Sequence, residues 1–286
     1  MPSVGSRVSL RYRLADSEAE AFTDVVGHIE ALTPLVVVRT KSGERVEIDP
    51  AAVMSARELS HAPVRNSEIR AVEHAAALAW PGTEQHWVDG WLLRAGGTTK
   101  RTNSAVPLLF SSDLTALPAI ADWYAARGLQ PWVALPERLL PVRTEGLEPN
   151  RLLTVELPAG SDVALPPRPD DRWLEIYGQD TPVEALSAVI DGEVAFATVA
   201  DAAVGRVSVS TAPDGRVWAG LSDVVVLESE RRRRLGRKVC AEMLAWASGH
   251  GATHAYVRVP DDNAAATTLA ESMGFRLHHR ARYILL

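Results

Sequence analysis

The chain has 286 residues, which is enough for two or three domains. Charged residues make up 23% and hydrophobic residues 47%, a balance typical of a globular protein, and this excludes a disordered or low-complexity chain. The formal net charge of -6 argues against nucleic acid and anionic membrane surfaces as partners.

Cysteine usage and hydropathy indicate the compartment. The single cysteine, Cys240, excludes an internal disulfide framework and a Cys-rich zinc module, and it is typical of a reducing environment. No apolar stretch reaches the roughly 20 residues that cross a bilayer. The start Met1-Pro2-Ser3 lacks the pattern of a secretory signal. We therefore expect a cytoplasmic protein with no membrane partner.

Residues 1–60 predict a small SH3-like β-barrel. Apolar and polar residues alternate over 4–14, and two further β-rich runs cover 23–29 and 34–40. The tetrad Lys41-Ser42-Gly43-Glu44 turns the last of these into another short strand. Such barrels bind peptides, bind nucleic acids or bind nothing. Because the sequence indicates no aromatic groove, a structural or docking role is favoured.

The middle segment, 66–163, contains two expected helices and two expected strands, the first strand at 90–94. One helix ends before Pro81, and another spans 117–127 and leads into a strand at 131–135. Residues 117–137 echo 240–261, because in both a Trp-bearing helix is followed by Gly, a strand with an aromatic residue, and Pro with an acid. The echo is compatible with a degenerate copy of the C-terminal fold, and equally with two unrelated helix-strand units.

The Pro-rich stretch 164–170 predicts a linker, after which a last domain covers 170–286. Its pattern predicts one β-hairpin of 189–190 with 193–199 and a second of 204–209 with 216–220. These are followed by a buried strand at 223–227, a helix at 236–247, a strand at 255–259, a helix at 263–273 and a final strand at 282–286. The expected fold class is α+β or α/β, with a mixed β-sheet flanked by helices.

One segment departs from the acidic character of the chain. Between Glu228 and Lys238 there are six positive and two negative side chains, and Gly236 opens an amphipathic helix. The unpaired N–H groups and the dipole of a helix start favour an anion, so this segment could cradle a diphosphate. The alternative is a solvated basic loop, which is what most arginine runs are.

Two motifs in this region resemble the GNAT superfamily of acyl-CoA-dependent N-acetyltransferases. Val226, Arg231 and Gly236 match the strand, loop and helix start of the first family signature. The second is matched from Asn263 through Leu269 to Gly274-Phe275. The resemblance covers residues 190–286, and it implies acetyl-CoA as co-substrate, an amine acceptor and no metal.

The resemblance also assigns residues to acetyl-CoA. It implies that the backbone of one strand pairs with the pantetheine amides and that the following loop wraps the pyrophosphate. It also implies that an Asn contacts the pantetheine arm, although a role as helix N-cap explains this Asn equally well. In chain order these residues are Val224, Val225, Val226, Arg231, Arg232, Arg233, Arg234, Leu235, Gly236, Arg237 and Asn263.

The expected reaction is direct attack of a neutral amine on the thioester, which needs a base and donors for the oxyanion. Asp223 is the leading candidate for the base, against the alternative of an exposed acid at a strand end, and Glu193 is weaker. Tyr256 and Trp218 are candidates for lining the acceptor site, although each also fits a structural role. The adjacent His278 and His279 should point to opposite faces of a strand, which argues against zinc.

Three positions depart from the family pattern. Glu228 replaces a common Pro, Arg234 replaces the first Gly of the loop, and Ala270 stands where a Tyr commonly protonates the leaving thiolate. The sequence therefore supports two hypotheses, an N-acetyltransferase and a catalytically weak or inactive acyl-CoA-binding regulatory module. The motifs specify neither the acceptor amine nor the oligomeric state.

Overall fold

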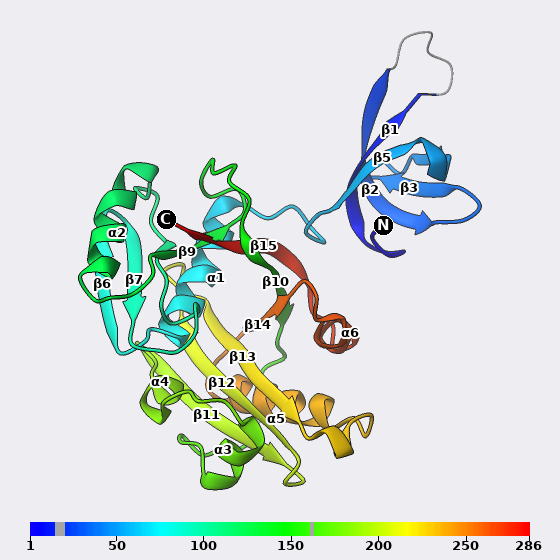
Figure 1. Cartoon of the computed structure of the whole chain (residues 1–286). Helices are drawn as coiled ribbons and strands as arrows, with labels where there is room; N and C mark the ends of the chain where they lie inside the picture. Colours follow the sequence, from blue (N-terminus) through cyan, green and yellow to red (C-terminus); the bar gives the residue numbers. More distant parts are fainter. Residues whose placement is uncertain (15–20, 161–162) are drawn as a thin grey trace. The chain divides into compact units, whose positions relative to one another are not determined.

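The computed structural model describes residues 1–14, 21–160 and 163–286. The chain divides into two compact units, Met1–Val64 and Arg65–Leu286 (Figure 1). Each unit is described by itself. The candidate site lies wholly in the second.

The first unit is a five-stranded antiparallel sheet in the order β4-β3-β2-β1-β5. Alternating residues of its strands, among them Val8, Leu10 and Ile29, form the core. The strands are β1 (Arg7–Arg13), β2 (Phe22–Ala31), β3 (Val36–Thr40), β4 (Arg45–Ile48) and β5 (Val53–Glu58). The small β unit expected here is confirmed, and among the described residues β4 and β5 are the two edges of its sheet, which is therefore not closed.

The second unit is built on a seven-stranded mixed sheet in the order β11-β12-β13-β14-β10-β15-β9. Its strands are β9 (Trp132–Pro136), β10 (Leu147–Glu156), β11 (Gly192–Val199), β12 (Ala203–Thr211), β13 (Val217–Val226), β14 (His254–Pro260) and β15 (Arg276–Leu285). The neighbours β13 and β14 run parallel, and the other pairs of this sheet are antiparallel.

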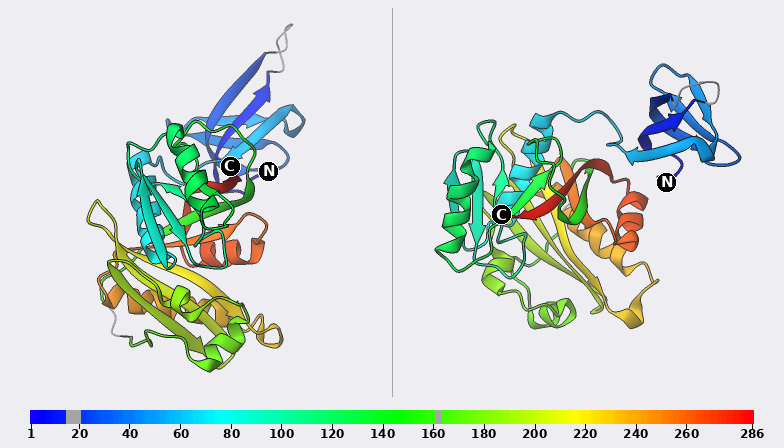
Figure 2. Two further views of the ribbon diagram at one scale, coloured as in Figure 1. Left: turned by 60° about the vertical axis from the view of Figure 1, so that its left-hand side comes forward. Right: turned by 45° about the horizontal axis from the view of Figure 1, so that its top comes forward.

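Helices cover both faces of this sheet (Figure 2). On one face α5 (Leu235–Gly249) packs Val239, Met243 and Trp246 against small residues of β11 to β13. On the other face lie α1 (Asn66–Ala79), α3 (Asp171–Tyr177) and α4 (Val183–Ser187). The helix α6 (Ala264–Ser272) follows β14. The expected class, a mixed sheet flanked by helices, is confirmed.

A smaller antiparallel sheet, β6-β7-β8, carries the helix α2. Its elements are β6 (Glu84–Val88), β7 (Trp91–Ala95), β8 (Val106–Pro107) and α2 (Leu117–Ala125). An isolated bridge between Ala105 and Val133 joins it to β9 of the large sheet. This sheet positions Arg94 and the loop that follows it beside the large sheet.

The strand β10 was not expected from the sequence. It precedes the Pro-rich stretch at 164–170, yet it lies between β14 and β15, which follow that stretch. Residues from both sides of the predicted linker therefore share one sheet. The interpretation of 66–163 as a degenerate copy stays a prediction.

Two local expectations were wrong. Val189 and Ile190 form no strand, and β11 instead pairs with β12 across the turn at Ala200–Asp201, where both residues have a positive φ. The expected strands at 216–220 and 223–227 are a single strand, β13, interrupted by an irregularity.

Candidate active site

The strands β13 and β14 separate in the middle of the sheet. They pair from Trp218 to Leu221 on β13, and the register ends at Leu221 opposite Val257. Beyond that point β13 continues to pair only with β12 among the described strands. Its main-chain groups on the β14 side are thus free to bind a ligand as a strand would.

A pocket of about 230 Å³ opens where the strands separate, and we call it the splay pocket. Its walls come from β13, β14, α5 and α6 and are largely apolar. They include Ser222, Val224, Cys240, Asn263, Ala270 and Phe275. Burial raises the pKa of the Cys240 thiol to about 12, so this cysteine stays protonated and unreactive.

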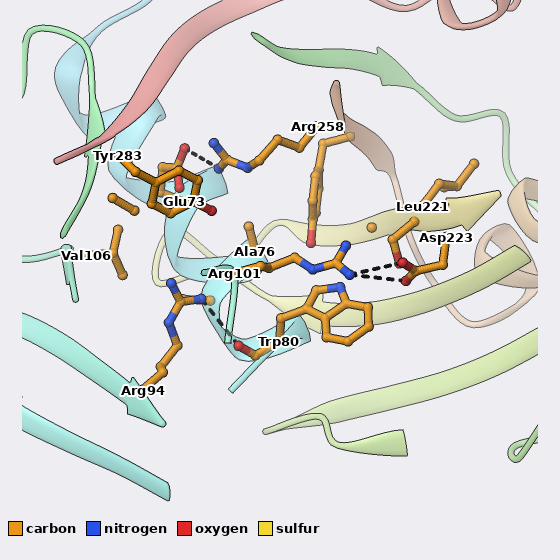
Figure 3. A pocket seen from close by; sticks show the side chains of 15 residues that line it. Glu73, Ala76, Trp80, Arg94, Arg101, Val106, Leu221, Asp223, Arg258 and Tyr283 are labelled. Atoms are coloured by element: carbon orange, nitrogen blue, oxygen red, sulfur yellow. Dashed lines mark hydrogen bonds and ion pairs between the residues drawn. The ribbon is translucent and has the colours of Figure 1, made fainter. Parts of the chain in front are cut away.

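Two further pockets adjoin the splay pocket. The inner pocket, about 100 Å³, is lined by charged and aromatic residues (Figure 3). They are Glu73, Trp80, Arg94, Arg101, Asp223, Tyr256, Arg258 and Tyr283. The outer pocket, about 590 Å³, includes Lys100, Arg101, Glu148, Asn150, Arg258 and Tyr283. Because Arg258 lines all three pockets, they meet around its side chain.

A β-bulge positions Asp223. Two residues of β13, Asp223 and Val224, stand opposite the single Gly205 of β12, and Asp223 has a φ of 54°. Such a bulge re-aims a side chain at the edge of a functional site. The Asp223 carboxylate lines both the splay and the inner pocket, and its Oδ1 lies 3.0 Å from Nη2 of Arg101.

The ring of Trp80 is sandwiched between two arginines. The guanidinium carbons of Arg101 and Arg206 lie 3.7 and 3.8 Å from its centroid, so they occupy opposite faces. Arg206 is fully buried and donates to the main-chain oxygens of Leu186, Ala79 and Ala188. Burial lowers its pKa to about 9, since the charged form loses its hydration.

A buried charged cluster holds Arg258. Oε1 of Glu73 accepts from Arg258 Nη2 at 2.6 Å and lies 2.7 Å from His279 Nε2. Burial alone would raise the pKa of Glu73. The charge of Arg258 and the hydrogen bonds from both partners outweigh burial and bring the pKa well below its usual range. Arg258 also donates to Oδ1 of Asn150 on β10, at 2.8 Å.

The sequence predicted that His278 and His279 point to opposite faces of a strand, and this prediction was wrong. A register irregularity in β15 brings the Nδ1 atoms of His278 and His279 to 2.8 Å. Burial, and then the neighbouring His279, lower the pKa of His278 to about 3. Among the described residues no group of three or more His, Cys, Asp or Glu side chains could hold a metal ion.

Two buried hydroxyls face the pockets without a hydrogen-bond partner in the described part of the chain. Ser222 lines both the splay and the inner pocket, and Tyr256 lines the inner one. A Cβ on Gly220 would lie 2.2 Å from the Tyr256 hydroxyl, so only glycine leaves room for that ring. Burial raises the pKa of Tyr256 to about 12, so its hydroxyl remains a proton donor.

The loop before α5 presents main-chain donors. No acceptor is recorded within the described chain for the N–H groups of residues 232–237, and the first helical bond runs from Lys238 N–H to the Arg234 carbonyl. Arg232 and Arg234 have φ values of 65° and 60°. Arg234 thus adopts the left-handed conformation for which the family uses glycine.

The arginine side chains of this loop are spread apart. Arg231 lies 3.8 Å from Glu228, and Arg233 lies 2.8 Å from Glu230, both in exposed pairs. Arg237 reaches across to Ser272 at the end of α6. The free N–H groups of this loop are thus close together in the chain, whereas its arginine side chains point to different partners.

Of the residues predicted to bind the cofactor, some line the splay pocket and others do not. Val224 and Asn263 line the splay pocket, and Asn263 is also the N-cap of α6, accepting from Ala266 N–H at 3.0 Å. Val225 and Val226 do not line it: Val226 packs with Val224 in the core on the α5 face, and Val225 packs in the core on the other face. Ala270 lines the splay pocket with a methyl group.

Of the two residues predicted to line the acceptor site, one lines a pocket and the other does not. Tyr256 lines the inner pocket, whereas Trp218 packs against α1 and is not among the lining residues. Glu193 is exposed and lies 3.7 Å from His250, and it lines none of the three pockets.

Sequence reasoning missed Glu73, Arg94, Arg101 and Arg258. Each lies in a stretch without a recognisable motif, and Arg101 is separated from Asp223 by 122 positions. One signal was available, a lone Glu73 on the apolar stripe of an Ala-rich helix.

No helix in the described ranges is both long and apolar enough to span a membrane.

The strand separation, the bulge and the helix start that follows β13 define a GNAT-type acetyltransferase. The chain belongs to the family described as "Probable histone acetyltransferase Rv0428c C-terminal", which matches residues 66–284, and residues 2–57 match the "Rv0428c N-terminal Sm-like domain".

Three proteins illustrate the similarity. "Probable histone acetyltransferase Rv0428c" of Mycobacterium tuberculosis is 45% identical over 99% of this chain and 95% of its own length. "Uncharacterized N-acetyltransferase YobR" of Bacillus subtilis is 26% identical over 73% of this chain and 94% of its own. The solved "GCN5-related N-acetyltransferase from Kribbella flavida" has a TM-score of 0.51 at 19% identity, covering 78% of this chain and 96% of that one, and shows the shared fold.

Proposed function

We propose that this acetyltransferase moves the acetyl group of acetyl-CoA to a primary amine by direct attack on the thioester. The observation that carries the proposal is the separation of β13 and β14 between two adjoining pockets. A thioester in the splay pocket and an amine in the inner pocket would meet at Ser222 and Asp223, which line both. Holding two reactants together in this way is itself a large catalytic contribution.

Acetyl-CoA would extend along the free edge of β13. The pantetheine amides pair with the main chain of Val224 to Val226, and Asn263 contacts the arm. The pyrophosphate receives hydrogen bonds from the N–H groups of residues 232–237, where the dipole of α5 adds positive potential. The side chains of Arg231 to Arg234 and Arg237, with Leu235 and Gly236 at the helix start, complete the loop.

Before attack, Asp223 takes one proton from the substrate ammonium group, directly or through water. The amine lone pair then forms the new C–N bond, and the carbonyl oxygen becomes an oxyanion. The C–S bond breaks as the carbonyl re-forms, and the thiolate of CoA takes up the second proton lost by the nitrogen. The hydroxyls of Ser222 and Tyr256, which lack protein partners in the described chain, donate to the oxyanion or the thiolate.

Ala270 supports a second candidate, a catalytically weak acyl-CoA-binding regulatory module. The methyl group supplies no acid at the place where the family commonly has a Tyr hydroxyl. In that case acetyl-CoA binds in the same pocket without efficient transfer. For the Sm-like unit we propose a docking role. We also propose that the protein lies in the cytoplasm, which its single, buried cysteine supports.

The mycobacterial relative is named a probable histone acetyltransferase, so a protein lysine is one candidate acceptor. Calorimetry with acetyl-CoA tests the common part of both hypotheses, because failure to bind at high micromolar ligand would overturn them together. Thiol release across a panel of amines then separates an enzyme, which releases CoA with at least one amine, from a module that binds without turnover.

A further inference from the structure

The inner pocket contains one more positive than negative side chain. Five charged residues line it, three arginines and two acids. Each acid has its own arginine, since Glu73 pairs with Arg258 at 2.6 Å and Asp223 pairs with Arg101 at 3.0 Å. Arg94 remains without a carboxylate partner among the described residues.

Arg94 is a buried cation held only by neutral oxygens. Its side chain donates to the Ser104 carbonyl at 3.3 Å, the Trp80 carbonyl at 3.3 Å and the Ser104 hydroxyl at 3.0 Å. The residue is 5% exposed. A buried charge without a counter-ion is costly, and a guanidinium matches the geometry of a carboxylate or phosphate group.

The surroundings add to this positive potential. Arg206 lies behind Trp80, also fully buried, and its three recorded partners are carbonyl oxygens. The Arg101 Nε and Arg206 Nη1 atoms are buried with no partner in the described chain. The phosphates of acetyl-CoA, proposed above to bind the N–H groups of residues 232–237, are a different anion, since Arg94 lines the inner pocket and none of those residues does.

The position of Arg94 gives the ligand a direction. Figure 3 shows Arg94 and Asp223 at opposite ends of the row of side chains, with Arg101 and Trp80 between them. Asp223 stands at the border with the splay pocket, where the amine is to react. An acceptor would thus place its amine at the Asp223 end and an anionic group at the Arg94 end.

We propose that the acceptor is a small amine that carries an anionic group, a carboxylate or a phosphate, which pairs with Arg94. This inference rests on the proposed acetyl transfer and names its substrate class. The inner pocket, at about 100 Å³, is smaller than the roughly 150 Å³ of an engineered cavity that holds benzene, so it limits the buried part of the acceptor to a few heavy atoms. A lysine in a strongly basic peptide brings the wrong charge to this pocket.

The test compares matched acceptors in a CoA-release assay. The panel contains ω-amino carboxylates of two to six carbons, the corresponding amides and alkylamines, aminoalkyl phosphonates, and a basic lysine peptide. We expect at least one carboxylate or phosphonate to exceed its neutral analogue in kcat/KM by about 100-fold, as expected for losing a charged hydrogen bond in a buried site. The carboxylate and phosphonate arms identify the anion.

The variant Arg94→Gln should bring the ratio between the anionic and neutral acceptors close to one, and Arg94→Lys should retain part of it. Arg216→Gln, an exposed arginine on the β12–β13 turn, is the control and should leave the ratio unchanged. The Arg94 variants are compared at equal acetyl-CoA affinity, which also verifies their folding. Calorimetry of the preferred acid with CoA-saturated protein provides a readout that does not need turnover.

Each outcome bears on one proposal. If acetyl groups reach neutral amines or the basic peptide as readily as the acids, the substrate class is wrong and the acetyl transfer stands. If acetyl-CoA does not bind and no thiol is released, the proposed function is wrong. Failure of every acid to bind the CoA-saturated protein overturns the Arg94 proposal by itself.

Discussion

Nη2 of Arg101 lies 3.0 Å from Oδ1 of Asp223, which joins a loop of the small sheet to the bulge of β13. This contact fixes the carboxylate at the border between the splay and the inner pocket. The loop at 96–103 and the strand β13 are thus in direct contact, although no motif links them in the sequence.

The first prediction concerns Asp223. Asp223→Asn should lower kcat about 100-fold or more, because a positioned general base contributes roughly 10²–10⁴ in rate, while the dissociation constant for acetyl-CoA changes less than about threefold. Steady-state thiol release and calorimetry measure the two. The matched control is Glu193→Gln, an exposed acid outside the pockets. A larger loss in that control would move the base away from Asp223.

The second prediction concerns Tyr256. Tyr256→Phe should lower kcat about 100-fold, as the loss of an oxyanion donor does. The melting temperature should stay the same or rise, because the lost hydroxyl is buried without a partner in the described chain. Since burial raises the Tyr256 pKa to about 12, the wild-type rate should show no loss of this proton around the ordinary value of 10.0. Undiminished turnover in the variant would assign donation to Ser222 or water.

The third prediction links Glu73 to stability. Glu73→Gln leaves the partly buried Arg258 without its carboxylate, and the cost at neutral pH should approach the roughly 3–5 kcal/mol of breaking a fully buried pair without reaching its upper end. The folded-state pKa of Glu73 lies below its ordinary value of 4.5, so the stabilisation is complete above pH 4.5 and is lost as the pH falls toward the folded-state value.

Denaturant unfolding at several pH values checks this. The difference between wild type and variant should be largest near pH 7 and should narrow in acid. Glu84→Gln, which breaks an exposed pair with Arg127, is the control and should have little effect. A difference that stays constant in acid would mean that packing, rather than charge, explains the loss.

The fourth prediction concerns the phosphates. The double variant Arg231→Gln and Arg232→Gln should weaken acetyl-CoA binding by about tenfold at low salt and less at high salt, because exposed charges are screened. Binding of acetyl-pantetheine, which lacks the pyrophosphate, should be unaffected. Equal losses for both ligands would contradict a pyrophosphate site at this loop.

Much of the C-terminal fold follows from local pattern. The helix expected at 236–247 is α5 at Leu235–Gly249, and the one expected at 263–273 is α6 at Ala264–Ser272. Both carry apolar residues at helical spacing and begin at recognisable loops, so local physics suffices.

The strand β10 could not be predicted in this way. It contains Pro149 and a positive φ at Glu148, features that argue against a central strand, and its alternation is weak. Its place is determined by pairing with β14 and β15, far along the chain. Non-local pairing leaves no signature in a short window of sequence.

The residues of the candidate site also differ in whether the local sequence predicts them. Asp223 and Val224 lie on the strand that leads into the first motif and Asn263 begins the second, so all three could be predicted from the sequence. Glu73 and Arg258, which are 185 positions apart, meet only in the folded chain. Buried polar side chains of this kind are chosen by their partners rather than by local propensity.

The position of β10 also sets an order of events during synthesis. About 100 residues separate it from its first partner, β14, which corresponds to on the order of ten seconds at ordinary translation rates. Throughout that interval both of its hydrogen-bonding edges wait for strands that do not yet exist. The part of the sheet around β10 can therefore close only after β14 and β15 have been synthesised.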